Sequence, residues 1–173
     1  DEMHRRLRER NFARRFACFT FDDGYRDNRD FALPVMREHD APFAVYVASD
    51  FASATGRLWW LALERLIARA DCVDAPIAGE TTRLDCSDTN AKSRTFATMH
   101  GWLRSLPSDT DVNRIVSDLC LRHGLDDSTI ARELCMSWTE LKAFAADPLV
   151  TIGPHTLTHC NLPKCSAEAD ERE

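Results

Sequence analysis

The sequence predicts an α/β fold, and three features of its pattern indicate that class. Short apolar runs at 16–21, 42–47 and 149–152 are bounded by turn-forming or polar residues, as buried strands are. The stretch between the first two runs has room for one helix, so these elements form a right-handed parallel strand–helix–strand unit. Apolar residues at helical spacing dominate 57–147, which we expect to be mostly helical.

The N-terminal elements follow from local signals. Residues 3–15 are rich in arginine and are expected to form a solvated helix or a frayed arm. A helix capped by Asp27 or Asn28 is expected to run to about His39, with Pro34 either in its first turn or at a kink. Its predicted inward-facing residues are Phe31, Val35 and Met36.

The later elements are marked by turn and capping residues. A small hairpin is predicted over 77–86, with Gly79 near its turn. Gly124 is expected to end a helix, and residues 137–140 (SWTE) form a capping box that starts another. The tail from residue 166 has the pattern of the first turns of a helix.

Acids and histidines follow two of the predicted strands. Asp22 and Asp23 end the first run before Gly24, whereas His155 and His159 follow the third run. One carboxylate and two imidazoles around a divalent ion leave positions open for water and substrate. Taken singly, the acids are typical of a capped turn and the histidines of satisfied loop residues. Taken together and in this order, they favour a metal site.

These two segments also carry a family resemblance. Residues 20–24 (TFDDG) and 155–159 (HTLTH) resemble the first two motifs of the polysaccharide deacetylases. These are NodB-like carbohydrate esterases that remove N-acetyl groups from chitin-type sugars. The resemblance covers roughly 16–60 and 137–166. It implies a distorted (β/α) barrel, of which the sequence shows the N-terminal portion with a largely helical insertion after the second strand.

The resemblance also implies a role for each residue of the site. Asp23, His155 and His159 would hold a divalent ion, most favourably zinc, with cobalt or another divalent ion as alternatives. Asp22 would act as the general base toward an N-acetylated carbohydrate. The backbone N–H of Tyr25 would help to hold the oxyanion, and Thr156 would brace the histidine loop.

The resemblance implies one deacetylase domain, divided into 16–56, 57–147 and 148–173. Since the sequence shows no counterpart of the family's later motifs, we expect a truncated domain with slow or no turnover. We also expect it to self-associate through an uncovered apolar face. A non-catalytic metal- or sugar-binding remnant is the first alternative. A 2-His-1-carboxylate iron oxygenase ranks last, because its usual His-x-Asp pairing is missing.

Composition excludes several other classes. The net charge of −6 disfavours nucleic acid as a partner, and no apolar run approaches the length of a membrane span. The first residues lack an apolar signal core, and the seven cysteines match no disulfide or zinc framework, so we expect free thiols in the cytoplasm. Cys160 follows a predicted ligand but is interpreted as a small buried residue. The histidines assigned no role are His4, His39, His100 and His123.

Overall fold

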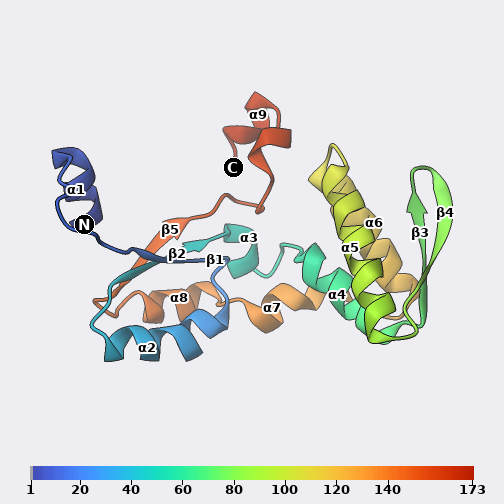
Figure 1. Ribbon diagram of the computed structural model, residues 1–173, viewed down its shortest axis with the longest axis horizontal. Coiled ribbons are helices and arrows are strands. Elements are labelled where there is room, and N and C mark those ends of the chain that lie inside the picture. Colours follow the sequence, from blue (N-terminus) through green and yellow to red (C-terminus); the bar gives the residue numbers. More distant parts are fainter. Residues whose placement is uncertain (1) are drawn as a thin grey trace.

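A computed structural model describes residues 2–173 and shows an α/β chain with two neighbouring parts (Figure 1). The first part contains a three-stranded sheet of β1 (Phe19–Asp22), β2 (Phe43–Val47) and β5 (Val150–Pro154). The second contains the longer helices and a hairpin of β3 (Cys72–Ile77) and β4 (Glu80–Asp85). The helices are α1 (Glu2–Glu9), η1 (Asn28–Ala32), α2 (Leu33–Glu38), α3 (Ser49–Ala52), α4 (Trp59–Arg69), α5 (Thr89–Ser105), α6 (Asp109–Arg122), η2 (Asp127–Thr129), α7 (Ile130–Leu134), α8 (Trp138–Phe144), η3 (Leu162–Lys164) and α9 (Ala167–Asp170).

The three-stranded sheet is parallel throughout, with the strand order β1-β2-β5. Phe21 lies opposite Val45, which in turn lies opposite Ile152. The predicted parallel strand–helix–strand unit is therefore confirmed. Because all three strands run in one direction, their carboxyl ends meet at one edge of the sheet, and this edge carries the loops that contain the acids and histidines.

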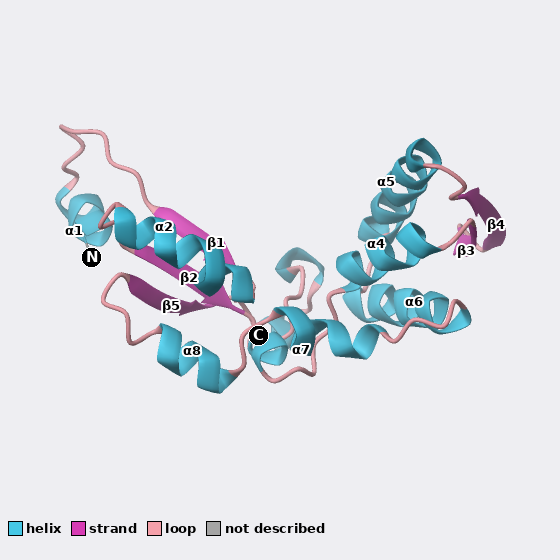
Figure 2. Cartoon of the chain, turned by 90° about the horizontal axis from the view of Figure 1, so that it is seen from below, coloured by secondary structure: helices cyan, strands magenta, loops and turns pink. Residues whose placement is uncertain are grey.

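Two hydrophobic clusters stabilise the two parts. In the first, α2 and α8 cover the sheet face that bears Phe43 and Val45, and both helices lie against the strands in Figure 2. In the second, α4 packs against α5 and α6 around Leu63 and Met99, and the hairpin adds Val73. Segment 57–147 thus contributes helices to both clusters. No helix among residues 2–173 is long and apolar enough to cross a membrane.

The expectation of a buried first strand was wrong. Residues 16–18 are not part of the strand, and Phe19 is 48% exposed. The reason is that β1 pairs only with β2 and forms an edge of the sheet. Aromatic and β-branched residues favour strands at an edge as well as in the centre, so composition did not distinguish the two positions.

The start of the helix after β1 also differs from the prediction. The side chain of Asp27 caps no backbone N–H, and the turn around Asn28–Ala32 is a π-helix that runs directly into α2. This wider turn precedes Pro34, whose ring would crowd the carbonyl of a regular helix. The widening rotates the helix face: Met36 is buried as expected, whereas Phe31 and Val35 are 75% and 52% exposed.

Several turn and cap predictions are confirmed. The hairpin turns at Ala78 and Gly79, both with positive φ, although its first strand begins earlier than expected, at Cys72. Gly124, at φ +68°, follows the end of α6. Both hydrogen bonds of the capping box form at the start of α8, between Ser137 and Glu140.

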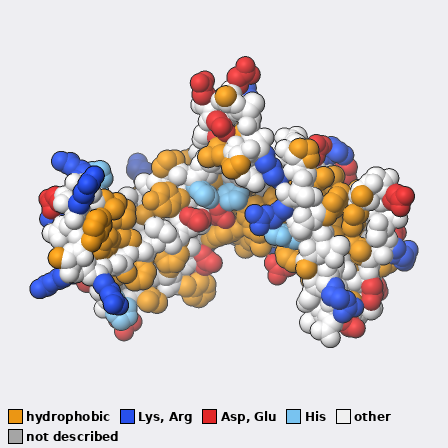
Figure 3. Space-filling view, turned by 45° about the horizontal axis from the view of Figure 1, so that its top comes forward, with side chains coloured by type: hydrophobic (Ala, Val, Ile, Leu, Met, Phe, Trp, Pro, Cys, Tyr) orange, Lys and Arg blue, Asp and Glu red, His pale blue; other side chains and the backbone are white. Residues whose placement is uncertain are grey.

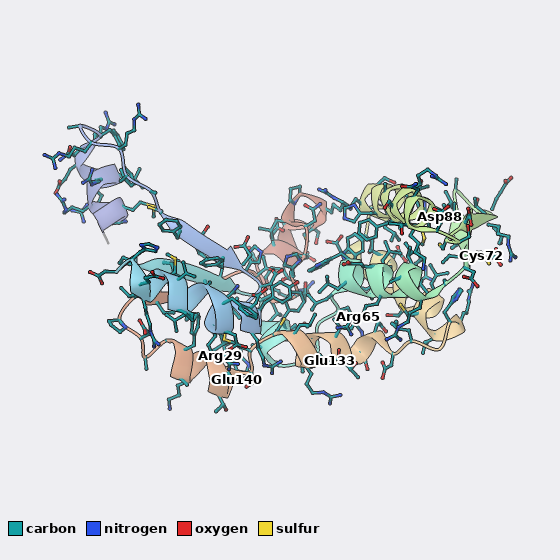
Figure 4. All side chains as sticks on the ribbon, turned by 60° about the horizontal axis from the view of Figure 1, so that its bottom comes forward. Arg29, Arg65, Cys72, Asp88, Glu133 and Glu140 are labelled. Carbon is teal, nitrogen blue, oxygen red and sulfur yellow. The ribbon has the colours of Figure 1, made fainter. Side chains whose placement is uncertain are left out.

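The capping carboxylate of Glu140 also joins α8 to the turn after β1. Arg26 donates two hydrogen bonds to it, at 2.8 and 2.9 Å, and Arg29 adds a third at 3.0 Å. Figure 4 shows Arg29 and Glu140 side by side. The hydrogen bonds from Arg26, and then those from Ser137, hold the pKa of Glu140 well below its usual range. This carboxylate therefore fixes α8 against the segment that follows the two acids.

We expect Glu140→Ala to lower the free energy of unfolding by about 2 kcal/mol. This value lies between the loss of a helix cap, about 1 kcal/mol, and the loss of one partner of a fully buried ion pair, about 3–5 kcal/mol. Glu133→Ala is the matched control, because Glu133 is a half-exposed partner of Arg65 (Figure 4) and should cost less than about 1 kcal/mol. Urea denaturation measures both variants.

The sign of the pH dependence gives a further check on Glu140. Its pKa is depressed in the folded state, so its stabilisation is present above the unfolded value of about 4.3 and is lost as the pH falls toward the folded value. The difference between wild type and Glu140→Ala should therefore shrink below about pH 4. Equal losses in the Glu140 and Glu133 variants would contradict this role.

Candidate metal centre

The turn after β1 places Asp23 at the carboxyl ends of the sheet strands. Asp23 and Gly24 both have left-handed backbone conformations, with φ of +67° and +68°. A glycine fits the second position for two reasons: it adopts this conformation freely, and a Cβ there would lie 3.1 Å from a methyl group of Val47. As a result Asp23 turns inward and is only 8% exposed, whereas Asp22 remains exposed at the end of the strand.

The histidine loop begins where β5 ends. The N–H of His155 donates to the carbonyl of Val47 at 2.9 Å, which extends the pairing of β5 with β2 by one residue. Thr156 and His159 then take left-handed conformations, with φ of +61° and +62°. The chain therefore reverses between the two histidines, and both imidazoles lie beside Asp23. Histidine side chains lie near the middle of the molecule in Figure 3, beside acidic and apolar ones.

The three predicted ligands come together in the structure. Oδ1 of Asp23 lies 3.2 Å from Nε2 of His159 and 3.7 Å from Nε2 of His155. One ligand atom from each residue lies within 4.8 Å of the other two. Both imidazoles are about one-third exposed, so the cluster opens to solvent on the histidine side.

These distances fit a divalent ion. Tetrahedral bonds of about 2.1 Å separate neighbouring ligand atoms by about 3.4 Å, which lies between the two observed separations. Oδ1 of Asp23 is buried and meets no donor with hydrogen-bond geometry among the described residues. A buried carboxylate oxygen without a donor is costly, and a cation in contact with it would remove that cost.

The same carboxylate controls the protonation of His159. Burial alone would lower the pKa of this histidine. The close contact of Nε2 with the Asp23 carboxylate, and then the negative charge of Asp23, outweigh burial and raise the pKa above its usual value. Asp22 adds a weaker effect of the same sign, which places its charge near the cluster. In the metal-free protein His159 therefore holds its proton to a higher pH than a free histidine does.

We expect zinc affinity to rise with pH across the range in which His159 loses this proton. A metal ligand must be a neutral imidazole, so protons compete with the ion, and below the raised pKa each pH unit should cost about tenfold in affinity. In the metal-free protein the sign is opposite: the His159–Asp23 pairing stabilises the fold below the unfolded pKa and is lost as the pH rises through the folded one. Competition with a chromogenic chelator between pH 5.5 and 8 measures the affinity.

His100→Gln provides the control for this titration. His100 stacks on Trp59 and Phe96 in the helical part, and it is not a member of the Asp23 cluster. Its variant should therefore follow the wild-type pH profile. A zinc affinity that does not change between pH 5.5 and 8 would contradict the assignment of histidine ligands.

Tyr25 and Thr156, the other predicted site residues, are close in sequence to the predicted ligands. Tyr25 forms an isolated antiparallel bridge with Cys135, and the N–H of Met136 donates to the carbonyl of Gly24 at 2.9 Å, so the backbone at Tyr25 is fixed beside the acid turn. Burial and the charge of Asp23 raise the pKa of the Tyr25 side chain. The hydroxyl of Thr156 is buried without a hydrogen-bond partner among residues 2–173, so the contacts that hold the loop come from other groups.

Sequence reasoning missed the residues that support the histidine loop. The carboxylate of Glu173 accepts hydrogen bonds from the N–H groups of Leu157 and Thr158, at 3.0 and 2.8 Å, and from the Thr158 hydroxyl at 2.9 Å. The rings of Phe51 and Trp60 pack on His159 with centroids 5.4 and 4.9 Å away. The adjacent tryptophans of α4 are visible in the sequence only as part of a helical apolar pattern, and nothing marks Glu173.

Fold and site together define an α/β protein with a candidate Asp-His-His metal centre at the carboxyl edge of a parallel sheet. A protein-family model described as polysaccharide deacetylase matches residues 9–173. The chain belongs to the polysaccharide deacetylase family, which supports hydrolysis of N-acetyl groups on carbohydrates. Its parallel sheet and many helices are compatible with the NodB-type fold. Searches of curated proteins and of solved structures found no match.

Proposed function

We propose that this chain is a metal-dependent deacetylase that releases acetate from N-acetylglucosamine-containing oligo- or polysaccharides. The observation that carries the proposal is the approach of Asp23, His155 and His159 to one point, in a chain of this family. A divalent ion held there, most favourably zinc, would lower the pKa of a bound water and polarise the amide carbonyl.

Each residue of the site has its own proposed role in the reaction. Asp23, His155 and His159 orient the metal, and the exposed carboxylate of Asp22 is free to accept the proton of the attacking water. The backbone N–H of Tyr25 is proposed to donate to the oxygen on which negative charge develops. Glu173 holds the backbone of Leu157 and Thr158, and so supports the position of His159 in the reaction.

Acetate release from N-acetylated chitooligosaccharides tests the proposal. The zinc-loaded protein should release acetate, at the slow rate expected from its sequence, and treatment with a chelator should stop the release until zinc is restored. Binding of the sugar without zinc-dependent acetate release would instead support the non-catalytic remnant. A requirement for oxygen and a cosubstrate would support the iron oxygenase.

A further inference from the structure

Two cysteines meet on the loop that follows the second histidine. Sγ of Cys165 lies 3.3 Å from Sγ of Cys160, and both residues are half-buried. Helix η3 lies between them and returns the chain on itself. A disulfide bond is about 2.0 Å long, so the two sulfurs need to approach by only about 1.3 Å.

The other five cysteines lack this arrangement. Cys86, Cys120 and Cys135 are buried in the helical part, and Cys18 is exposed on the segment before β1. The sulfur of Cys72 accepts a hydrogen bond from Arg83 at 2.9 Å. Among residues 2–173, Cys160 and Cys165 are the only two cysteines whose sulfurs are in contact.

The pair is joined to the candidate metal centre through the backbone. Cys160 directly follows His159, whose φ of +62° is a conformation that non-glycine residues rarely adopt. Only noncovalent contacts hold the loop in place. Among them are the hydrogen bonds to Glu173, one from the Asp50 N–H to the Leu157 carbonyl at 2.9 Å, and one from the Asn161 N–H to Asp109 at 2.6 Å. A covalent bond from Cys160 to Cys165 would restrict the conformations to which this loop can relax.

We propose that Cys160 and Cys165 are a reversible dithiol–disulfide pair that locks the histidine loop when oxidised. Two S–H bonds break and one S–S bond forms in this step. The two protons and two electrons pass to a small-molecule disulfide such as oxidised glutathione, which is cleaved to two thiols. The cross-link itself is independent of the proposed deacetylase function, and only its effect on zinc rests on that function.

The sequence makes the cross-link directly detectable. Lys164 lies between the two cysteines, so trypsin separates Cys160, on peptide 143–164, from Cys165, on peptide 165–172. The protein is incubated with oxidised glutathione for hours at pH 8. Mass spectrometry should then find the two peptides joined, with two hydrogens lost from the intact chain.

Cys165→Ser is the matched control, because it removes one thiol without changing the residue next to His159. This variant should give a mixed disulfide with glutathione at Cys160 and no joined peptides. The proposal is overturned if wild type carries glutathione on both cysteines without an internal bond. It is also overturned if either cysteine joins equally to one of the other five.

Zinc release measures the effect on the loop. Oxidised wild type should lose zinc to a chelator at least about threefold more slowly than reduced wild type, whereas oxidation should not change the rate in Cys165→Ser. Equal rates in oxidised and reduced wild type would overturn the locking role. If zinc does not bind at all, the deacetylase proposal fails, and the melting temperature of the metal-free protein replaces zinc release as the measurement. Oxidation should raise this melting temperature in wild type and leave it unchanged in Cys165→Ser.

Discussion

Asp23→Asn is expected to reduce zinc affinity by more than about 100-fold, which exceeds the usual effect of removing a group that only supports a ligand. The carboxylate faces both imidazoles through a buried oxygen that meets no donor with hydrogen-bond geometry among residues 2–173, so a neutral amide removes the negative charge that a cation needs. Isothermal titration calorimetry of the metal-free protein measures the affinity.

Asp74→Asn is the control for this substitution. Asp74 is an exposed residue of the β3–β4 hairpin, paired with Arg83 at 3.6 Å, and its variant should bind zinc as wild type does. Both variants should also keep the wild-type circular dichroism spectrum. If Asp23→Asn is folded and binds zinc with wild-type affinity, Asp23 is not a ligand.

Asp22→Asn is expected to lower zinc-dependent acetate release by about 10²- to 10⁴-fold, the usual contribution of a general base. Zinc affinity should change by less than about threefold, because Asp22 is exposed and lies outside the three-residue cluster. The change should therefore appear in kcat and not in metal content. Undiminished acetate release by the variant would assign the base to another residue.

The residues of the candidate site could be predicted from the sequence more fully than the packing of the strands and helices. The acids and histidines were visible because parallel strands bring the ends of distant segments to one edge, so Asp23 and His159 could be paired across more than a hundred residues. The capping box at Ser137 and the stop at Gly124 were visible because each depends on a few adjacent residues.

The errors concern strand order, helix geometry and the path of the chain, none of which the pattern of apolar residues reports. Phe19 is exposed because β1 is an edge strand, and no local pattern reports strand order. Phe31 and Val35 face outward because a π-helical turn before Pro34 shifts the helix register, whereas the expected spacing assumed a regular helix. The support of the histidine loop by Glu173 depends on the path of the chain after Cys165 and has no short-range signature.

Anomalous diffraction at the zinc edge, from crystals of the zinc-loaded protein, tests the metal centre most directly. We predict a single peak bonded to the Asp23 carboxylate and to Nε2 of His155 and His159, at about 2.0–2.2 Å from each atom. A peak at the thiols of Cys160 and Cys165, or no peak near Asp23, would contradict the metal centre and the deacetylase function that depends on it.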